Sequence, residues 1–130
     1  AELEGLAARL AAQHAAPEEI TVLFDMVEED RALIDDPDRM SRANKRFHRQ
    51  LHLASHNRYL IQQLELVHRS MALMSKTTFA AEGRGPVALE EHRQIVAAID
   101  ARDGDAADAA IRAHISAAFE TRLKQNARPV

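Results

Sequence analysis

Histidine is the residue type with the clearest chemical potential in this sequence, because seven of the 130 residues are histidines. His48, His92 and His114 each lie three residues from an aliphatic residue on the apolar stripe of a predicted helix. A buried imidazole is costly unless its nitrogens find partners, and a divalent metal ion is one such partner. Because the three histidines lie on separate predicted helices, they can converge in one core. The pattern therefore indicates a metal site, with hydrogen-bonded core histidines as the alternative.

The other four histidines occupy less informative positions. His14 lies at a predicted helix end, where an imidazolium suits the helix dipole. His52 and His56 continue a four-residue ladder from His48, and His56 falls in a last turn that we expect to be solvated. His68 lies off the apolar stripe of its helix, which favours a surface or pocket-rim position.

Several other kinds of site are excluded or disfavoured. Cysteine is absent, which excludes disulfides, thiolate nucleophiles and cysteine-based zinc fingers. A di-iron bundle needs two Glu-x-x-His pairs, and Glu65 with His68 forms the only one. We expect Glu90 and Glu91, directly before His92, to be a solvated charge pair. The sequence contains no Gly-rich phosphate loop, G-x-S-x-G elbow or H-E-x-x-H motif.

Charge and hydropathy exclude further classes of protein. Seventeen basic against twenty acidic residues give a formal net charge of −3, the wrong sign for a free-standing nucleic-acid-binding protein. No apolar run approaches the roughly 18 to 20 residues that a membrane span needs, and no signal-peptide pattern opens the chain. The sequence predicts a cytoplasmic protein without membrane contact.

The elements that must position the histidines are helices. Helix formers dominate, while the β-branched and aromatic runs typical of strands are missing. Asn57 is a predicted cap, Gly104 a predicted helix stop with Asp105 capping the next start, and residues 80–86 form the one clear loop. We therefore predict one all-α domain over residues 1–130, an antiparallel bundle of six or seven helices without a sheet. The predicted helices span residues 2–15, 17–36, 38–55, 58–78, 87–102 and 106–125.

The heptad-like spacing of apolar residues predicts which helix faces are buried. The predicted inner positions include Leu3, Leu6, Ala7 and Leu10 in the first helix, Met40, Phe47 and Leu51 in the third, Leu60, Leu64, Val67, Met71 and Met74 in the fourth, and Ile111, Ile115, Ala118 and Phe119 in the last.

Three stretches of the sequence resemble a known family. They are LEGLAARLAA at residues 3–12, NKRFH at 44–48 with ASHN at 54–57, and EHRQIVAAI at 91–99 with Arg102-Asp103, followed by His114. Together they resemble the FCD domain, the C-terminal ligand-sensing domain of a large branch of GntR-family transcription regulators. The similarity covers nearly the whole chain, in order and with suitable spacing.

The resemblance implies a bundle that encloses a small-molecule pocket with a divalent metal at its floor. Family members hold the metal with an Asp or Asn four residues before a His, plus two later histidines; here these are Asn44, His48, His92 and His114. The first ligand is commonly Asp, and the neutral Asn is expected to weaken the site. The family also implies a homodimer and a winged helix-turn-helix for DNA, to which nothing in this chain corresponds.

The third predicted helix offers two partners for His48, since Asn44 and His52 both lie one turn away. Imidazole is the better ligand for zinc or nickel, the two metals that we expect. Turning His52 inward, however, is expected to rotate Met40 and Phe47 out of the core, at roughly 1.5 to 3 kcal/mol each. We therefore place Asn44 in the metal site and His52 outside it.

Three functional hypotheses follow. The first is a sensor of a small organic acid that completes the coordination of the metal, with Arg69 and Arg9 as candidate clamps for its far end. The alternative from the enzyme class is a metal-dependent hydrolase or lyase that uses a metal-bound water. That reading needs a general base near the metal, and no inward-facing Asp or Glu stands out, so we expect no enzyme. The third hypothesis is an interaction bundle without a metal.

Overall fold

The architecture is an all-α bundle, as predicted. It was obtained as a computed structural model, which describes residues 1–71 and 77–128, and these residues contain no strand. The described elements are α1 (Glu2–His14), α2 (Pro17–Asp30), the 3₁₀ helix η1 (Arg31–Leu33), α3 (Pro37–Ala54), α4 (Arg58–Met71), the 3₁₀ helix η2 (Thr78–Ala80), α5 (Arg84–Asp100) and α6 (Gly104–Ala127).

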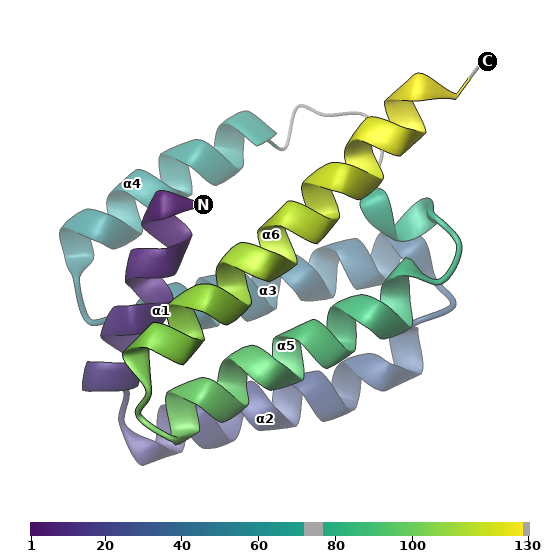
Figure 1. Ribbon diagram of the computed structural model, residues 1–130. Coiled ribbons are helices and arrows are strands. Elements are labelled where there is room, and N and C mark those ends of the chain that lie inside the picture. The colour runs from purple at the N-terminus through teal and green to yellow at the C-terminus, as the bar shows by residue number, and fades with distance from the viewer. Residues whose placement is uncertain (72–76, 129–130) are drawn as a thin grey trace.

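The helices surround one continuous apolar core. Helix α5 packs between α6 and α2, and α1 crosses α6 near the N-terminal end of α6 (Figure 1). Phe47, Leu51 and Ile95 are completely buried at the centre. Each such side chain contributes about 1.5 to 3 kcal/mol of burial free energy, so this core fixes how α3 and α5 face each other.

Side-chain caps explain where several helices begin. The Asp36 carboxylate accepts a hydrogen bond from the Arg39 amide at 3.2 Å, and Asn57 accepts one from Leu60 at 3.0 Å, which confirms the predicted Asn57 cap. The cap of α6 differs from the prediction, because Asp103 and not Asp105 accepts from the Ala106 amide, at 3.0 Å.

The connections on either side of α5 also differ from the prediction. Gly104 was expected to stop a helix, but it is the first residue of α6, while Arg102 adopts the left-handed conformation with φ 57°. Helix α5 begins at Arg84, inside the predicted loop, because Gly83 takes φ 76° and turns the chain there. Pro86 then lies in the first turn, where its missing N–H leaves no hydrogen bond unmade.

The buried face of α1 was predicted wrongly at two positions. Leu3 and Leu6 are 37% and 42% exposed, whereas the small residues of α1 and Glu4 are buried. Helix α1 turns its small side chains to α6 because close approach of the two backbones is possible only there. A Cβ on Gly5 would lie 2.8 Å from the Arg112 Nε of α6, so a larger residue there has to displace the Arg112 side chain.

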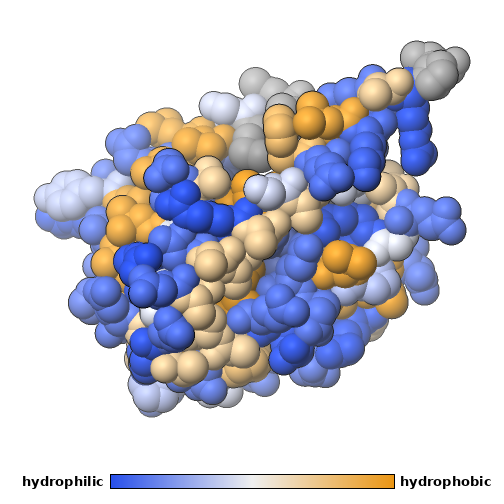
Figure 2. Space-filling model, viewed as in Figure 1, coloured by the Kyte–Doolittle hydropathy of each residue, from blue (hydrophilic) through white to orange (hydrophobic). Residues whose placement is uncertain are grey.

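Two further apolar residues point outward. Val67 is 44% and Phe119 62% exposed, against the prediction that both are internal. The predicted continuation of the fourth helix through 72–76, with Met74, lies outside the described residues, and Thr78 begins η2 instead. Figure 2 shows apolar surface gathered over α4 and the neighbouring part of α1. Within the described ranges, no helix is both long and apolar enough to cross a bilayer.

Candidate metal centre

Three buried imidazoles meet where α3, α5 and α6 face one another. His48 comes from α3, His92 from α5 and His114 from α6, and these residues are at most 5% exposed. The ring centroids of His92 and His114 lie 4.7 Å apart, and those of His48 and His114 lie 5.2 Å apart. One nitrogen from each ring can be chosen so that all three lie within 4.8 Å of one another. The structure thus brings together the three histidines that were predicted from their spacing to face the core.

The separation of His48 and His114 suits a shared metal ion. Their Nε2 atoms lie 3.2 Å apart. Two nitrogens bound to one zinc at 2.0 to 2.1 Å in tetrahedral geometry are about 3.3 Å apart. A hydrogen bond between two neutral rings has the same length. The distance is therefore compatible with a shared metal ion and with a direct hydrogen bond between the rings.

Glu91 fixes the orientation of His114. Its Oε1 accepts a hydrogen bond from the His114 Nδ1 at 2.7 Å, which leaves the lone pair of Nε2 pointing toward His48. Burial raises the pKa of Glu91, but the hydrogen bonds from His114 and Arg84 outweigh it and lower the pKa overall. Metal-binding histidines are usually held by such a carboxylate on the far nitrogen. The expectation that Glu91 is a solvated charge partner is wrong; only Glu90 is exposed, paired with Arg93.

His92 has no hydrogen-bonding partner for either ring nitrogen, although both are buried. Its ring stacks on Phe47 with centroids 4.1 Å apart and planes 9° apart. Burial lowers its pKa well below the usual 6.5, and the nearby His48, His114 and Arg84 add to the effect. A neutral, unpartnered imidazole is the form that binds a metal ion.

Asn44 lies one helical turn before His48 on α3, as predicted. Its Oδ1 is buried and accepts no hydrogen bond. Unpaired buried polar atoms are costly, and an amide oxygen one helical turn from His48 is a donor that a cation at the centre would satisfy. The residues present therefore fit a divalent cation held by nitrogen and oxygen donors.

His52 does not point into this centre, but it is buried, and the argument from helix rotation was wrong. Met40, Phe47 and His52 are all 5% or less exposed, because α3 is covered on two sides. The side chain of His52 faces α1, where its Nε2 lies 2.9 Å from the Oε2 of Glu4. The His68 side chain also contacts Glu4, with its Nε2 2.8 Å from the Oε1 of Glu4, and it is 36% exposed.

Of the two arginines proposed as ligand clamps, one is engaged in ion pairs and the other is exposed. Arg9 forms ion pairs with Asp105 and Asp108 of α6, at 2.5 and 3.0 Å, and Arg69 is exposed near the end of α4.

Arg84 is the cation beside the centre. It is 6% exposed, its Nη2 lies 2.8 Å from the same Glu91 oxygen that binds His114, and its buried Nε has no partner. Sequence analysis missed Arg84 because it was assigned to a loop. Because α5 begins at Arg84 and not at residue 87, Arg84 lies eight residues, or about two helical turns, before His92.

Comparison with known proteins identifies the family. The sequence profile described as the FCD domain matches residues 1–117. The chain belongs to the FCD domain family. An uncharacterised HTH-type transcriptional regulator, YdhC of Bacillus subtilis (strain 168), is 31% identical over 117 residues, which are 88% of this chain and 52% of the relative. This FCD domain thus spans about half the length of that curated relative.

A solved structure supports the fold. E. coli McbR/YncC superposes with a TM-score of 0.77 over 96% of this chain and 61% of that chain, at 16% sequence identity. At that identity the likeness concerns the fold of the FCD domain alone.

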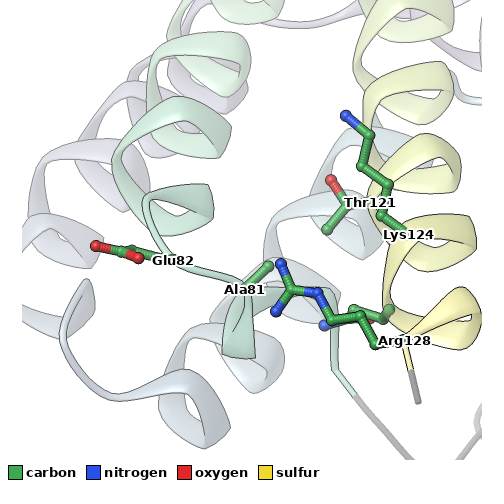
Figure 3. Close-up of a pocket in the computed structure, with 6 residues that line it drawn as sticks. Ala81, Glu82, Thr121, Lys124 and Arg128 are labelled. Carbon is green, nitrogen blue, oxygen red and sulfur yellow. The ribbon is translucent and has the colours of Figure 1, made fainter.

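The FCD domain also has a surface pocket of about 400 Å³ between the start of α5 and the last turns of α6. Ala81 and Glu82 line one side, and Thr121, Lys124 and Arg128 the other (Figure 3). None of these residues belongs to the histidine centre, so the pocket is a separate feature.

Proposed function

We propose that this FCD domain, residues 1–130, is the effector-sensing domain of a transcription regulator. In this proposal a divalent metal, zinc or nickel, is held by Asn44, His48, His92 and His114. A small organic acid binds to the metal and so changes how a separate DNA-binding domain engages its operator. The observation that carries the proposal is the set of buried imidazoles from three helices, among which His92 has no partner for either nitrogen.

The charge of the donor set favours an anionic effector. Three neutral imidazoles and one amide leave the full charge of a divalent ion uncompensated in a poorly solvated site. When bound, the metal supplies positive charge and open coordination positions. Besides the metal, the buried guanidinium of Arg84 adds positive charge near His114, because it contacts the same Glu91 oxygen, and its Nε–H has no partner. A guanidinium can hold the far carboxylate of a diacid or a hydroxy acid.

Glu91 is the group that an effector has to compete with. It accepts hydrogen bonds from Arg84 and His114 through one oxygen. An incoming carboxylate that binds Arg84 takes over part of this pairing, so effector binding is linked to the orientation of His114. This link couples the ligand to α5 and α6.

The proposed oligomer is a homodimer, and its contact surface follows from exposure. Leu3 and Leu6 of α1 and Leu66 and Val67 of α4 are between 37% and 57% exposed, and α1 contacts α4. Such apolar patches indicate interaction surfaces. A two-fold pair fits regulators that read two-fold operators.

An enzymatic role is the less favoured reading. The matched relative is described as a regulator of transcription. The carboxylate next to the histidine centre, Glu91, is committed to Arg84 and His114, which leaves it unsuited to act as a general base on a metal-bound water.

The test combines metal loading with a panel of acids. Thermal stability is measured for zinc-loaded and chelator-treated protein with mono-, di- and tricarboxylates, sugars and amines. We expect stabilisation by carboxylates in the zinc-loaded protein alone. Arg84→Ala should weaken that stabilisation, while Arg69→Ala, a matched change at an exposed arginine, should not. Stabilisation by neutral sugars or amines, without any by carboxylates, contradicts the proposal.

A further inference from the structure

A second histidine cluster lies next to the metal centre, on the side of α1. Its middle is the carboxylate of Glu4, a residue that is 8% exposed. The Oε2 of Glu4 lies 2.9 Å from the Nε2 of His52, and its Oε1 lies 2.8 Å from the Nε2 of His68. The three side chains come from α1, α3 and α4. One carboxylate and two imidazoles therefore point at one another from three different helices.

A third imidazole presents an unused nitrogen to the same carboxylate. The Nδ1 of His48 is buried, lies 3.8 Å from the Oε2 of Glu4 and has no hydrogen-bonding partner. Donor atoms of Glu4, His48 and His52 all lie within 4.8 Å of one another. The cluster thus has more donor atoms directed inward than its own hydrogen bonds use.

The charge of the cluster is unbalanced. Within the described part of the chain, all the ion-pair partners of Glu4 are histidines. Both carboxylate oxygens of Glu4 face imidazole nitrogens, and a buried carboxylate without a permanent cation beside it favours a positive ion as its partner.

We propose that Glu4, His52 and His68 form a second divalent-cation site, separate from the histidine centre. Two imidazoles and one carboxylate are a ligand set that binds zinc and ferrous iron, with water at the remaining positions. To bind, each neutral histidine moves its proton from Nε2 to Nδ1, so the number of protons does not change. His68 is 36% exposed, which opens the site to ions from solvent.

The competing explanation is a purely hydrogen-bonded contact in which Glu4 holds α1 against α3 and α4. Glutamine distinguishes the two. Its side-chain amide can still donate a hydrogen bond to Glu4, but it is a poor ligand for zinc. His68→Gln and His52→Gln therefore keep the contact and remove the ligand. His68→Gln is the safer variant for folding, because that side chain is partly exposed.

The experiment counts zinc per chain. Metal-free protein is loaded with zinc and washed, bound zinc is measured by elemental analysis, and cobalt titrations follow the absorption of each site. We expect two equivalents in the wild type, one in His68→Gln, one in His114→Ala and none in the double variant. Circular dichroism confirms that each variant is folded.

The outcomes distinguish failure of the second site, failure of the centre and failure of both. A wild type with a single equivalent that His68→Gln and His52→Gln retain overturns the second site and leaves the centre in place. Two equivalents, of which His114→Ala removes neither and His68→Gln removes one, support the second site and count against the proposed centre. A wild type with no tightly bound zinc or cobalt overturns both.

Discussion

The two histidine clusters lie on opposite sides of the His48 ring and differ in how their nitrogens are satisfied. In the centre, His92 has no partner for either nitrogen, and Glu91 bonds to the Nδ1 of His114, on the far side of that ring from His48. In the Glu4 cluster the carboxylate is in the middle and each of two imidazoles bonds one of its oxygens. The centre is therefore electropositive when it holds a cation, whereas the Glu4 cluster is closer to neutral.

The number of histidines in a cluster therefore does not define what the cluster binds. A cation held by neutral donors attracts an anionic effector, because its charge is not compensated locally. A divalent cation held by one carboxylate has half of its charge compensated, so it would stabilise the packing of α1, α3 and α4 and have less charge left for an effector. The predictions below test this distinction.

Removing an imidazole from the centre should have the largest effect. His92→Ala or His114→Ala should weaken zinc binding at the centre by at least about 100-fold, since even an outer partner is worth 10- to 100-fold. Competition with a chromophoric chelator measures the affinity. The matched change His52→Ala should leave affinity at the centre nearly intact. Loss of that affinity in His52→Ala, with retention in Asn44→Ala, contradicts the assignment.

Glu91→Gln should weaken zinc at the centre by about 10- to 100-fold, because the His114 ring loses its charged acceptor. Glu4→Gln should affect the centre less, since its oxygen lies 3.8 Å from His48 Nδ1 and makes no hydrogen bond there. The same chelator competition compares the two variants. Equal losses would mean that both carboxylates support the centre to the same degree.

Gly5→Ala should change the free energy of unfolding by no more than about 1 kcal/mol, because the added methyl meets only the side chains of Asp108 and Arg112, which lose part of their ion pairing as they move aside. Urea unfolding measures the change. Because neither side chain belongs to a histidine cluster, the cobalt spectra of both clusters should stay unchanged. A changed spectrum would show that the substitution moves α1.

The free energy of unfolding of the metal-free protein should decrease as the pH is lowered, in two separate pH ranges. Burial lowers the pKa of His48 and His92, so below pH 6.5 the unfolded chain takes up protons that the folded chain does not. Stability is then complete above 6.5 and falls below it by up to about 1.4 kcal/mol per pH unit for each histidine.

The Glu4 contribution behaves differently. Its pKa is lowered from 4.5, so its stabilisation is complete above pH 4.5 and is lost only at lower pH. Urea unfolding in chelator from pH 8 to 4 separates the two windows. His92→Leu should reduce the slope below pH 6.5 without changing the acid limb, and an unchanged slope would contradict the assignment to His92.

Asn44→Asp should have the smallest effect, a gain in zinc affinity of less than about 10-fold, because a negative ligand replaces a neutral one. The same charge should weaken carboxylate binding, since it compensates the metal. Calorimetry with zinc, and then with the best acid of the panel, measures both changes. Tighter zinc together with tighter acid binding would argue that effector affinity does not depend on the uncompensated charge.

Much of the fold was predictable because its determinants are local. Helix formers, the Asn57 cap and the apolar spacing on α3 depend on residues within one or two turns of one another, and the structure agrees with them. The errors arose where contacts with another helix, or the backbone conformation of a turn, determine burial and helix boundaries. Leu3 and Leu6 have helical spacing, but α1 packs on α6 through its glycine and alanines, whose small side chains let the two helices approach closely. Similarly, Gly83 started α5 earlier than the proline suggested.

The helical class and the inward position of His48, His92 and His114 follow from the sequence alone, because one period of 3.6 residues governs both. The sequence also carried the FCD motifs that the family match bears out. Only the tertiary structure decided the partners of those histidines. Glu91, Arg84 and Glu4 reach the clusters from positions that no spacing rule connects to them, because the contacts depend on how separate helices cross. The chemistry of each cluster is therefore set by the packing of the helices, which no single segment of the sequence encodes.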